Sequence, residues 1–474
     1  MSETEIETPA VDALGAGAVP ESTLDEDNHL TRDFVDRVVE LVEVGEADKA
    51  RALVEPLHPA DIADLFEQVP SEARQPLAGA LADLVDGDVI AEMNDWVREE
   101  VIEELDPHQV ADIASELDTD DAVAIIEDME EEDQRAVLRA MDADDRAAIE
   151  EALSYPEESA GRLMQRDLIA VPEHWNVGDV RAYLLGNEDL TTDFWEVFVV
   201  DAAHRPIGTC KVSWLMRAAD ATPVAGIMQH EQTLIPVDMD QEEVALRFQK
   251  YALISAAVID KSGRLVGMIT VDDIVHIIQE EAGEDILRLS GAGDGDINEP
   301  IFFTVKTRLT WLVVNLGTAI VAASVVGLFQ GEIARFALLA VLMPIVSGMG
   351  GNAGTQTLAV IVRAIATNQL TSSNTWRMIA REFRIAASNG ASLGILIGTG
   401  TFLVYRNPDL AIVIGLAMVI NNLVAGLAGV LIPIGLDRAR IDPAVSSAVF
   451  VTMATDVMGF FSFLGLATLW GLGG

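Results

Sequence analysis

The sequence predicts a multidomain chain of three parts: an all-α superhelical N-terminal domain, an α+β tandem repeat, and a polytopic α-helical membrane domain with five spans. Three observations support this fold class. Helical periodicity with few glycines runs through residues 30–153, two similar strand-and-helix patterns follow one another in residues 157–282, and five long apolar stretches fill residues 309–474.

Charge is distributed unevenly along the chain. The net charge is −47, yet beyond residue 300 ten basic residues outnumber six acidic ones, so the acid excess lies entirely in the first 300 residues. Such an acidic part excludes nucleic acid and anionic lipid as its partners and suits a cation-responsive surface. For most of these acids, a solvated acidic surface of the kind favoured in saline habitats is the better explanation. The single cysteine, Cys210, excludes an intramolecular disulfide and a Cys-rich metal centre.

The first part of the chain is a short tail and a helical domain. Residues 1–29 are polar and acidic with no apolar core, so we expect a disordered tail and no cleavable signal peptide. Residues 30–156 form the acidic helical domain. In it Pro59-Ala-Asp-Ile-Ala-Asp-Leu65 and Pro107-His-Gln-Val-Ala-Asp-Ile113 align at a spacing of 48, each starting a helix at proline. This repeat predicts a small superhelical stack.

The second part contains two copies of one α+β unit, residues 157–220 and 221–282. Ala160-Gly-Arg-Leu-Met-Gln165 in the first copy is echoed by Val224-Ala-Gly-Ile-Met-Gln229 in the second. Each copy is typical of a short strand, an amphipathic helix (residues 177–185 and 241–251), a β-hairpin and a closing helix. A connecting helix over residues 283–304 then leads to the membrane domain.

The third part, residues 305–474, contains the membrane spans. The stretches are about 309–331, 336–362, 385–405, 410–436 and 444–472, and each has the ~20 residues that a helix needs to cross the bilayer core. Eight of the ten basic residues fall at span ends on one side of the membrane. The positive-inside rule therefore predicts a multi-pass protein of the cell (inner) membrane with a cytoplasmic N-terminus and an extracytoplasmic C-terminus.

One acid, Asp456, lies near the middle of the last span. A carboxylate at the centre of a bilayer costs roughly 2.5 to 3.5 kcal/mol on insertion scales, so it faces a bundle interior, a partner or an ion path. No basic residue lies near mid-span to pair with it. We therefore interpret Asp456 as an ion ligand, with Thr452 one helical turn earlier on the same face.

The second span carries a cluster of helix-perturbing and polar residues. Pro344 removes a helical donor, and the glycines at 348, 350, 351 and 354 remove side chains, so this span can bend and expose carbonyl groups. Close helix packing explains the glycines equally well. Asn352 and Gln356 share one helical face and offer neutral oxygens to a hydrated cation, and we place Asn352 on the pore.

These patterns together resemble a known family. The α+β repeat is similar to a tandem pair of CBS domains, and the whole chain from about residue 30 resembles the MgtE-type magnesium channel and transporter family. The resemblance rests on Pro344-Ile-Val-Ser-Gly-Met-Gly-Gly-Asn-Ala-Gly-Thr-Gln356, on Thr270-Val-Asp-Asp273 with the helix that follows it, and on Ala454-Thr-Asp-Val-Met-Gly459. CBS pairs alone occur in many proteins, so the membrane motifs make the resemblance specific.

The resemblance implies a homodimeric, Mg²⁺-selective channel that imports Mg²⁺ and is closed by high intracellular Mg²⁺. The connecting helix would plug the pore, and Mg²⁺ bridging acidic residues of the cytosolic domains would hold the closed state. The metal-binding residues expected from the sequence and the resemblance are, in the pore, Asp456, Asn352 and Thr452, and, for cytosolic Mg²⁺ sensing, Asp240, Asp273, Glu281, Glu284 and Asp285.

A nucleotide is a second expected input. Gly267-Met-Ile-Thr270 followed by Asp273 resembles the CBS signature in which a Thr hydroxyl and an Asp carboxylate hold the ribose and phosphate of ATP or another adenine nucleotide. An empty structural CBS pair is an equally good interpretation. The chain departs from the family pattern at His276 and Ala252, where related sequences often carry acids, so some sensor sites are expected to be weaker.

Other functions stay open at this stage. The same architecture could carry another divalent cation such as Co²⁺ or Ca²⁺, or serve as a CBS-regulated membrane sensor that transports nothing. An intramembrane enzyme is poorly supported, because the spans contain no His cluster and no Ser/Lys or paired-Asp arrangement. We expect no enzymatic activity, and the lipid bilayer, a second copy of the chain and the divalent cation as the partners, with no nucleic acid and no other soluble substrate.

Overall fold

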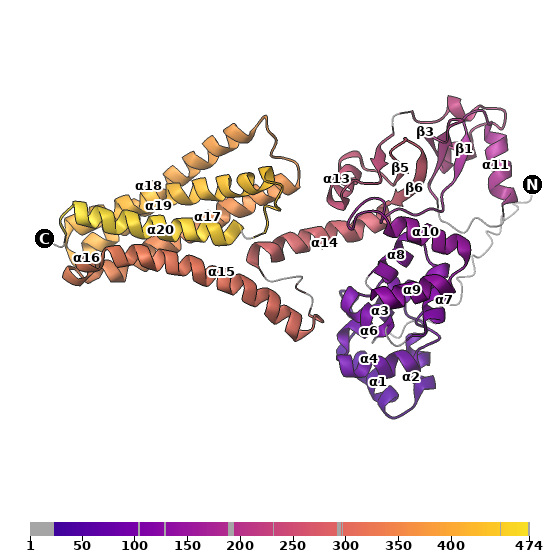
Figure 1. Cartoon of the computed structure of the whole chain (residues 1–474), viewed down its shortest axis with the longest axis horizontal. Coiled ribbons are helices and arrows are strands. Elements are labelled where there is room, and N and C mark those ends of the chain that lie inside the picture. Colours follow the sequence, from indigo (N-terminus) through magenta and orange to yellow (C-terminus); the bar gives the residue numbers. More distant parts are fainter. Residues whose placement is uncertain are drawn as a thin grey trace, which may run out of the picture. The chain divides into compact units, whose positions relative to one another are not determined.

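The computed structural model describes residues 23–102, 105–127, 129–187, 194–230, 232–291, 295, 297–445 and 447–472. The chain divides into two compact units, Met1–Ile278 and Gln279–Gly474, each of which is described by itself (Figure 1). Most of the predicted disordered tail, residues 1–22, lies outside the described residues. The remainder of that tail forms a turn closed by a bridge between Leu24 and Leu30.

Short helices build the first part of the N-terminal unit, as the periodicity predicts (Figure 1). Pro59 and Pro107 occupy the first turn of their helices, where a missing N–H costs nothing, and Asp106 and Gln109 form a capping box around the second of these starts. The helices are α1 Arg32–Glu43, α2 Ala47–Val54, α3 Pro59–Gln68, α4 Ser71–Ala80, α5 Gly87–Ala91, α6 Asp95–Ile102, α7 Pro107–Glu116, α8 Thr119–Glu127, α9 Glu131–Ala140 and α10 Ala143–Leu153.

One apolar core runs through these helices, from Leu30 to Ala152. Two cations are buried at its edge, and both are satisfied. Arg74 donates to the backbone oxygen of Phe66 at 3.0 Å and to Glu100 at 2.8 Å, and Arg98 pairs with Asp95 at 2.5 Å. A buried charge is costly unless it is paired. These contacts therefore allow the two arginines to be buried beside the core of the helical domain.

Both copies of the α+β unit form the predicted elements. In each, a three-stranded sheet pairs its middle strand parallel to the first strand and antiparallel to the third. The first copy contains β1 Ala170–Pro172, α11 Val177–Gly186, β2 Glu196–Val200, β3 Pro206–Lys211 and α12 Val212–Arg217, and the second contains β4 Leu234–Pro236, α13 Gln241–Tyr251, β5 Ser255–Ile259, β6 Leu265–Thr270 and α14 Val271–Ser290.

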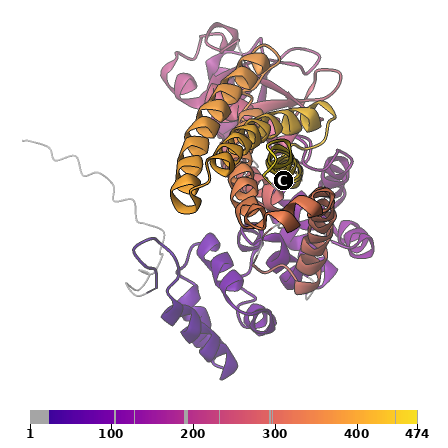
Figure 2. The same ribbon diagram turned by 90° about the vertical axis from the view of Figure 1, so that its left-hand side faces the viewer.

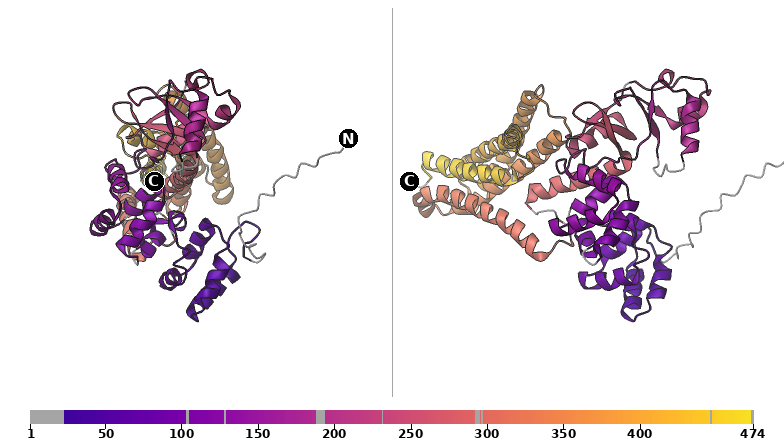
Figure 3. Two further views of the ribbon diagram at one scale, coloured as in Figure 1. Left: turned by 90° about the vertical axis from the view of Figure 1, so that its right-hand side faces the viewer. Right: turned by 45° about the vertical axis from the view of Figure 1, so that its right-hand side comes forward.

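The two copies exchange the segment whose repetition is visible in the sequence. Gln165, near the start of the first copy, bridges to Met268 in β6 of the second copy, while Gln229, near the start of the second copy, bridges to Thr209 in β3 of the first copy. A small apolar core that includes Phe198 joins the two sheets, which lie next to each other in Figures 1 and 3. The repeated segment therefore connects the two α+β copies to each other.

The C-terminal unit contains, among the described residues, five helices long and apolar enough to cross a membrane, as predicted. They are α15 Ile301–Leu328, α17 Leu338–Ala366, α18 Thr375–Tyr405, α19 Pro408–Arg438 and α20 Ser447–Leu469, with the short α16 Gln330–Arg335 between the first two.

The connecting helix differs from its predicted range of 283–304. Helix α14 begins directly after β6 at Val271 and ends at Ser290, where Gly291 adopts a left-handed φ of +68° against Trp311 of α15. Residues from Gly291 to Pro300 then connect it to the first span, which starts at Ile301 rather than at 309. The acidic character of 279–285 does not break the helix, because Gln, Glu and Ala are all good helix formers.

Helix α19 packs against α17, α18 and α20, and it supplies the largest share of buried residues among the spans. Viewed end-on in Figure 2, α20 lies between α15 and the remaining spans. Backbones approach closely where α18 crosses α19, because a Cβ at Gly394 would lie 2.7 Å from the Gly415 oxygen. The N-terminal part of α15 diverges from α20 (Figures 1 and 3), and its apolar side chains are exposed within one chain.

Candidate functional site

Asp456 lies in the middle of α20 and is held by a residue of another span. Its carboxylate accepts a short hydrogen bond from the hydroxyl of Ser347 on α17. Asp456 and Ser347 are both half-buried. Within the described residues no Lys or Arg pairs with Asp456, so its charge is compensated by a neutral donor alone. A carboxylate held in this way keeps its remaining oxygen positions for water or a cation.

Some glycines of α17 are explained by close helix packing, and others leave the helix surface open. The helix is continuous from Leu338 to Ala366 with Pro344 inside it. Gly350 and Gly354 are packing positions, because a Cβ on Gly350 would lie 2.1 Å from the Asn421 amide and one on Gly354 would lie 2.5 Å from Val451. Gly348 and Gly351 face open space. Close packing therefore explains half of this glycine cluster.

The other pore residues expected from the sequence lie at the surface of the single chain. Asn352 and Gln356 are exposed on the face of α17 that the bundle leaves uncovered, and Thr452 is exposed on α20. The Thr452 carbonyl accepts a hydrogen bond from Thr455 at 2.9 Å. Their roles in the pore stay predictions.

A second charged site lies in the N-terminal unit, where α8 meets the start of α14. Asp118, Asp120 and Asp121 at the beginning of α8 interact electrostatically with Asp273 in the first turn of α14. Oδ1 of Asp120 is inaccessible to solvent and has no hydrogen-bond partner in the described part of the chain. Four carboxylates therefore concentrate negative charge at one place, and one of them has an orphaned buried oxygen.

Burial dominates the ionisation of these acids. Loss of hydration, together with the charge of neighbouring carboxylates, raises the pKa of Asp121 and of Asp273 to about 6, although the hydrogen bond from Thr270 acts to lower that of Asp273. The same burial raises the pKa of Asp120 well above its ordinary value. Without a cation, this cluster is therefore partly protonated at neutral pH.

The carboxylates of this cluster are of the ligand type that Mg²⁺ prefers, but they do not converge on one point. Within the described residues no three His, Cys, Asp or Glu side chains are close enough together to bind one ion simultaneously. Mg²⁺ usually keeps several waters and takes only one or two protein carboxylates, so a hydrated ion fits such an arrangement.

The remaining predicted sensor residues occupy other places. The side chain of Asp240 caps α13 by accepting the Glu242 N–H at 3.0 Å. Glu284 on α14 forms an ion pair with Arg288, one helical turn later. Glu281 is half-buried on the same helix, and the side chain of Asp285 lies outside the described residues. Sensing by these residues stays a prediction.

The predicted nucleotide residues are adjacent but bonded to one another. The hydroxyl of Thr270 donates to Oδ2 of Asp273 at 2.7 Å. Because Asp273 interacts electrostatically with acids of α8, the phosphates of a nucleotide would meet like charge at this position. Nucleotide binding there stays a prediction that this charge disfavours.

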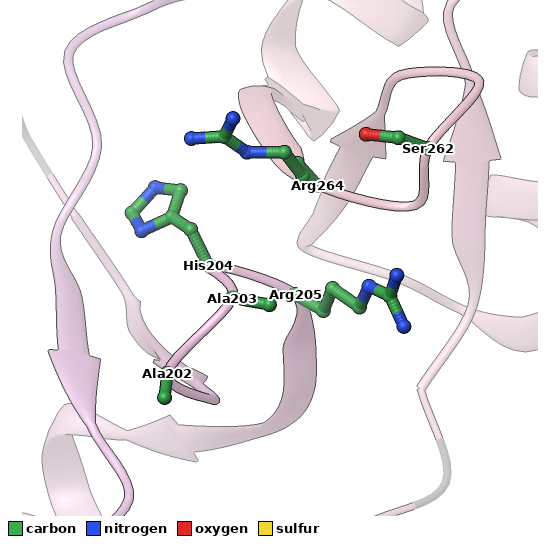
Figure 4. Close-up of a pocket in the computed structure, with 6 residues that line it drawn as sticks. All are labelled: Ala202, Ala203, His204, Arg205, Ser262 and Arg264. Carbon is green, nitrogen blue, oxygen red and sulfur yellow. The ribbon is translucent and has the colours of Figure 1, made fainter.

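Two pockets accompany the α+β pair. A cleft of about 440 Å³ is lined by Glu196, Lys211 and Ser255 among others, and the Ser255 hydroxyl donates to Glu196 at 3.3 Å. A shallower pocket of about 400 Å³ lies at the tips of the two hairpins (Figure 4). In Figure 4, His204 and Arg264 extend to one side of these tips and Arg205 to the other. Neither pocket contains a predicted site residue.

Residues 343–466 match the family of divalent cation transporters, residues 57–158 the MgtE intracellular N domain, and residues 224–280 the CBS domain. The magnesium transporter MgtE of Thermus thermophilus is 32% identical over 319 residues, which are 66% of this chain and 70% of that protein. The magnesium transporter MgtE of Enterococcus faecalis is 31% identical over 317 residues, 67% of this chain and 70% of that protein.

Among solved structures, the cytosolic domain of the Mg²⁺ channel MgtE in complex with ATP is similar, with a TM-score of 0.47 and 28% identity over 51% of this chain and 99% of that chain. The five spans, the CBS pair and the divalent cation transporter match define a multi-pass cation transport protein of the membrane. More specifically, the chain belongs to the MgtE family of magnesium transporters.

Proposed function

We propose that this protein is a homodimeric Mg²⁺ channel that imports Mg²⁺ across the cell membrane, with Asp456 as the ion-binding carboxylate of the pore. The observation that supports this most is the environment of Asp456. It is a mid-span acid without a cationic partner in the described residues, fixed in direction by the Ser347 hydroxyl. An intramembrane carboxylate kept under these conditions is a functional group by default, because insertion penalises it.

The proposed dimer explains why the other pore candidates are uncovered in one chain. Asn352 and Thr452 are exposed on α17 and α20, the two helices that hold Ser347 and Asp456. In a twofold arrangement one Asp456 from each subunit would face a single hydrated dication. Two carboxylates suffice for Mg²⁺, because the ion retains most of its octahedral water shell.

Gating by intracellular Mg²⁺ is the second part of the proposal. Asp118, Asp120 and Asp121 at α8 interact electrostatically with Asp273 at the start of α14. Without a cation, the carboxylates repel one another and disfavour this contact. Mg²⁺ would bridge them and stabilise the contact, so high intracellular Mg²⁺ would shift the population toward the closed channel. The proposal requires the N-terminal unit to lie in the cytoplasm.

A channel for another divalent cation, Co²⁺ or Ca²⁺, is the alternative. Flux into proteoliposomes decides between them, with Mg²⁺, Co²⁺ and Ca²⁺ each supplied at equal concentration and with an Asp456→Asn variant as the matched control. We expect Mg²⁺ flux that the variant lacks. Uptake of Ca²⁺ or Co²⁺ in preference to Mg²⁺ would replace the proposal by its alternative, and the absence of any flux would favour a sensor that transports nothing.

We also propose a regulatory adenine nucleotide at Thr270 and Asp273. Calorimetric titration of the full-length protein with ATP, with and without Mg²⁺, tests it, because Mg²⁺ would neutralise the phosphates beside the acids of α8. Loss of binding in Thr270→Ala would support this position, and unchanged binding would exclude it.

A further inference from the structure

A polar side chain is buried in the apolar bundle beside the Asp456 helix. Asn421 on α19 is completely inaccessible to solvent, although polar side chains are disfavoured inside a membrane. Its amide nitrogen donates to the backbone oxygen of Val346 on α17 at 2.8 Å. Val346 directly precedes Ser347, so Asn421 holds the same turn of α17 that holds the Asp456 carboxylate.

The Asn421 amide also fills the space between two backbones. An added Cβ at Gly350 on α17 would lie 2.1 Å from Nδ2 of Asn421, and one at Gly459 on α20 would lie 2.8 Å from the same atom. Side chains at either position would therefore displace the amide. The carboxamide is a spacer that both helices contact through glycine, and its size sets how closely α17 and α20 can approach.

This spacer lies one helical turn from the Ser347–Asp456 hydrogen bond on both helices. Gly350 follows Ser347 by three residues, and Gly459 follows Asp456 by three residues, and residues three apart occupy the same side of a helix. The two contacts are therefore neighbouring steps of one seam between α17 and α20. A change in the separation of the helices at one step is transmitted to the other, because packed helices are stiff over a single turn.

The next residue, Asn422, provides a comparison inside the same helix. It is equally buried, but its amide donates to Met418 of its own helix at 2.9 Å, and its Cβ faces Gly390 on α18. Oδ1 of each asparagine is buried without a partner in the described part of the chain. The two residues thus share burial and chemistry, and only Asn421 bonds across to the helix of Ser347.

We propose that Asn421 is a positioning residue for Mg²⁺ transport, which acts by fixing the separation of α17 and α20 at the level of Asp456. This rests on the proposed role of Asp456 as the ion ligand. Loss of a residue that orients a metal ligand lowers the affinity of the site for the ion, whereas the fraction of folded protein changes less. The proposal therefore makes a prediction about ion affinity.

The test measures Mg²⁺ flux of full-length protein in proteoliposomes as a function of Mg²⁺ concentration. In Asn421→Ala we expect the half-saturating Mg²⁺ concentration to rise roughly 10- to 100-fold, as for loss of other groups that orient metal ligands. The maximal flux changes less, and Asn422→Ala, the matched control, stays close to wild type. Thermal unfolding in detergent reports whether each variant is folded.

A second pair of variants separates positioning from general packing. Gly350→Ala leaves Asn421 in place but displaces its amide, so it is expected to raise the half-saturating concentration on its own. In the Asn421→Ala background the added methyl group meets no amide. Gly350→Ala should therefore raise the half-saturating Mg²⁺ concentration little further, so the effects of the two changes are non-additive. If Asn421→Ala does not fold, Asn421→Ser and Gly350→Ala carry the same test.

The outcomes are distinct. Wild-type half-saturation in a folded Asn421→Ala protein, equal effects of Asn421→Ala and Asn422→Ala, or additive losses with Gly350→Ala would each overturn the positioning role. Asp456→Asn is measured in the same series. If that variant transports Mg²⁺ normally, the proposed function fails. If Asp456→Asn transports no Mg²⁺ but Asn421→Ala behaves like wild type, only the proposed role of Asn421 is excluded.

Discussion

The hydroxyl of Ser347 on α17 donates a hydrogen bond to the carboxylate of Asp456 on α20. This contact connects the glycine-rich motif of the second span to the one acid in the middle of the fifth. It links residues 109 positions apart, and it gives the carboxylate a fixed direction without cancelling its charge. The pore chemistry proposed for this protein therefore depends on two helices at once.

Removal of the Asp456 charge is the most direct test of the pore. Asp456→Ala should abolish Mg²⁺ flux while the protein stays folded, because no other described acid lies at mid-span. Asp456→Asn keeps the shape and the contact with Ser347 but loses the charge, so its flux should also be severely reduced. Radioactive or dye-based Mg²⁺ uptake into proteoliposomes measures both, and normal transport by either variant would contradict the assignment.

Loss of the Ser347 hydroxyl should weaken ion binding without abolishing transport. A hydrogen bond to a charged group contributes about 1.5 to 3 kcal/mol, which corresponds to roughly 10- to 100-fold in affinity. We therefore expect Ser347→Ala to raise the half-saturating Mg²⁺ concentration by up to that factor. Ser347→Thr keeps the hydroxyl and should stay near wild type. An unchanged half-saturation in Ser347→Ala would show that the hydroxyl does not orient the carboxylate.

The acid cluster at α8 predicts a pH dependence with a defined sign. Since burial raises the pKa values of Asp121 and Asp273 to about 6 from 3.8, the folded cluster binds more protons than the unfolded chain between these values. Without Mg²⁺, the stability of this region should therefore fall as pH rises through 6. Glu92, Asp88 and Asp272 add negative charge nearby and act in the same direction.

Hydrogen exchange of residues 119–127, corrected for the intrinsic exchange rate, measures this stability. Mg²⁺ needs deprotonated carboxylates, so the protection it adds should be largest above pH 7 and should decline as the pH falls through about 6. Asp120→Asn removes one of the repelling charges and should flatten the pH dependence in the absence of Mg²⁺. Mg²⁺-induced protection that is equal at pH 5.5 and pH 8 would exclude the cluster as the binding site.

Neutralising the acids of α14 tests the gate. If ion bridging holds the closed state, the Glu281→Gln, Glu284→Gln and Asp285→Asn triple variant should lose inhibition by millimolar Mg²⁺, because a ligand shifts an equilibrium only through its differential affinity. Should the acids act only through repulsion, the variant would stay closed even without Mg²⁺. Flux measured with Mg²⁺ on the cytoplasmic side separates the two.

Arg288 supplies the control for that experiment. It pairs with Glu284 and also donates to Asp442 at 2.8 Å, just before α20. Arg288→Gln breaks this contact but leaves the three acids in place. An identical response in Arg288→Gln and in the triple variant would assign the effect to the loss of the Arg288 contact rather than to Mg²⁺ binding.

Membrane orientation is tested with reporters. A reporter fused before Leu30 should be found in the cytoplasm, and one fused after Gly474 outside it, because the basic residues cluster at one side of the spans. A cytoplasmic C-terminal reporter would mean that the number of spans crossing the membrane is even.

Local patterns in the sequence predicted most of the fold. Proline starts of α3 and α7, the repeated strand-helix-hairpin order and the five apolar stretches all depend on residues a few positions apart, so propensity, capping and hydropathy determine them directly. The connecting helix was the exception. Its predicted range of 283–304 followed the boundary between domains, whereas the backbone continues the helix from Val271, because no residue there interrupts it.

The candidate site was predictable only in part, because local patterns identify residues but not their contacts with distant segments. Asp456 and Asp273 stand out because their residue types conflict with an apolar span or belong to a recognisable motif. The contacts that give them chemical meaning join distant segments: Ser347 with Asp456, the acids of α8 with Asp273, and Arg288 with Asp442. Consecutive asparagines in an apolar span were a visible signal for Asn421, but its direction depends on how α19 packs.

The sequence by itself determined which segments are helices, strands and spans, the charge of each part and the family, because these properties depend on local composition and short-range periodicity. The tertiary structure alone decided which acids lose their water and share one place, and which neutral donor orients the mid-span carboxylate. Burial and long-range contacts determine the pKa values of the acids and the orientation of the Asp456 carboxylate, and the spacing of neighbouring residues predicts neither.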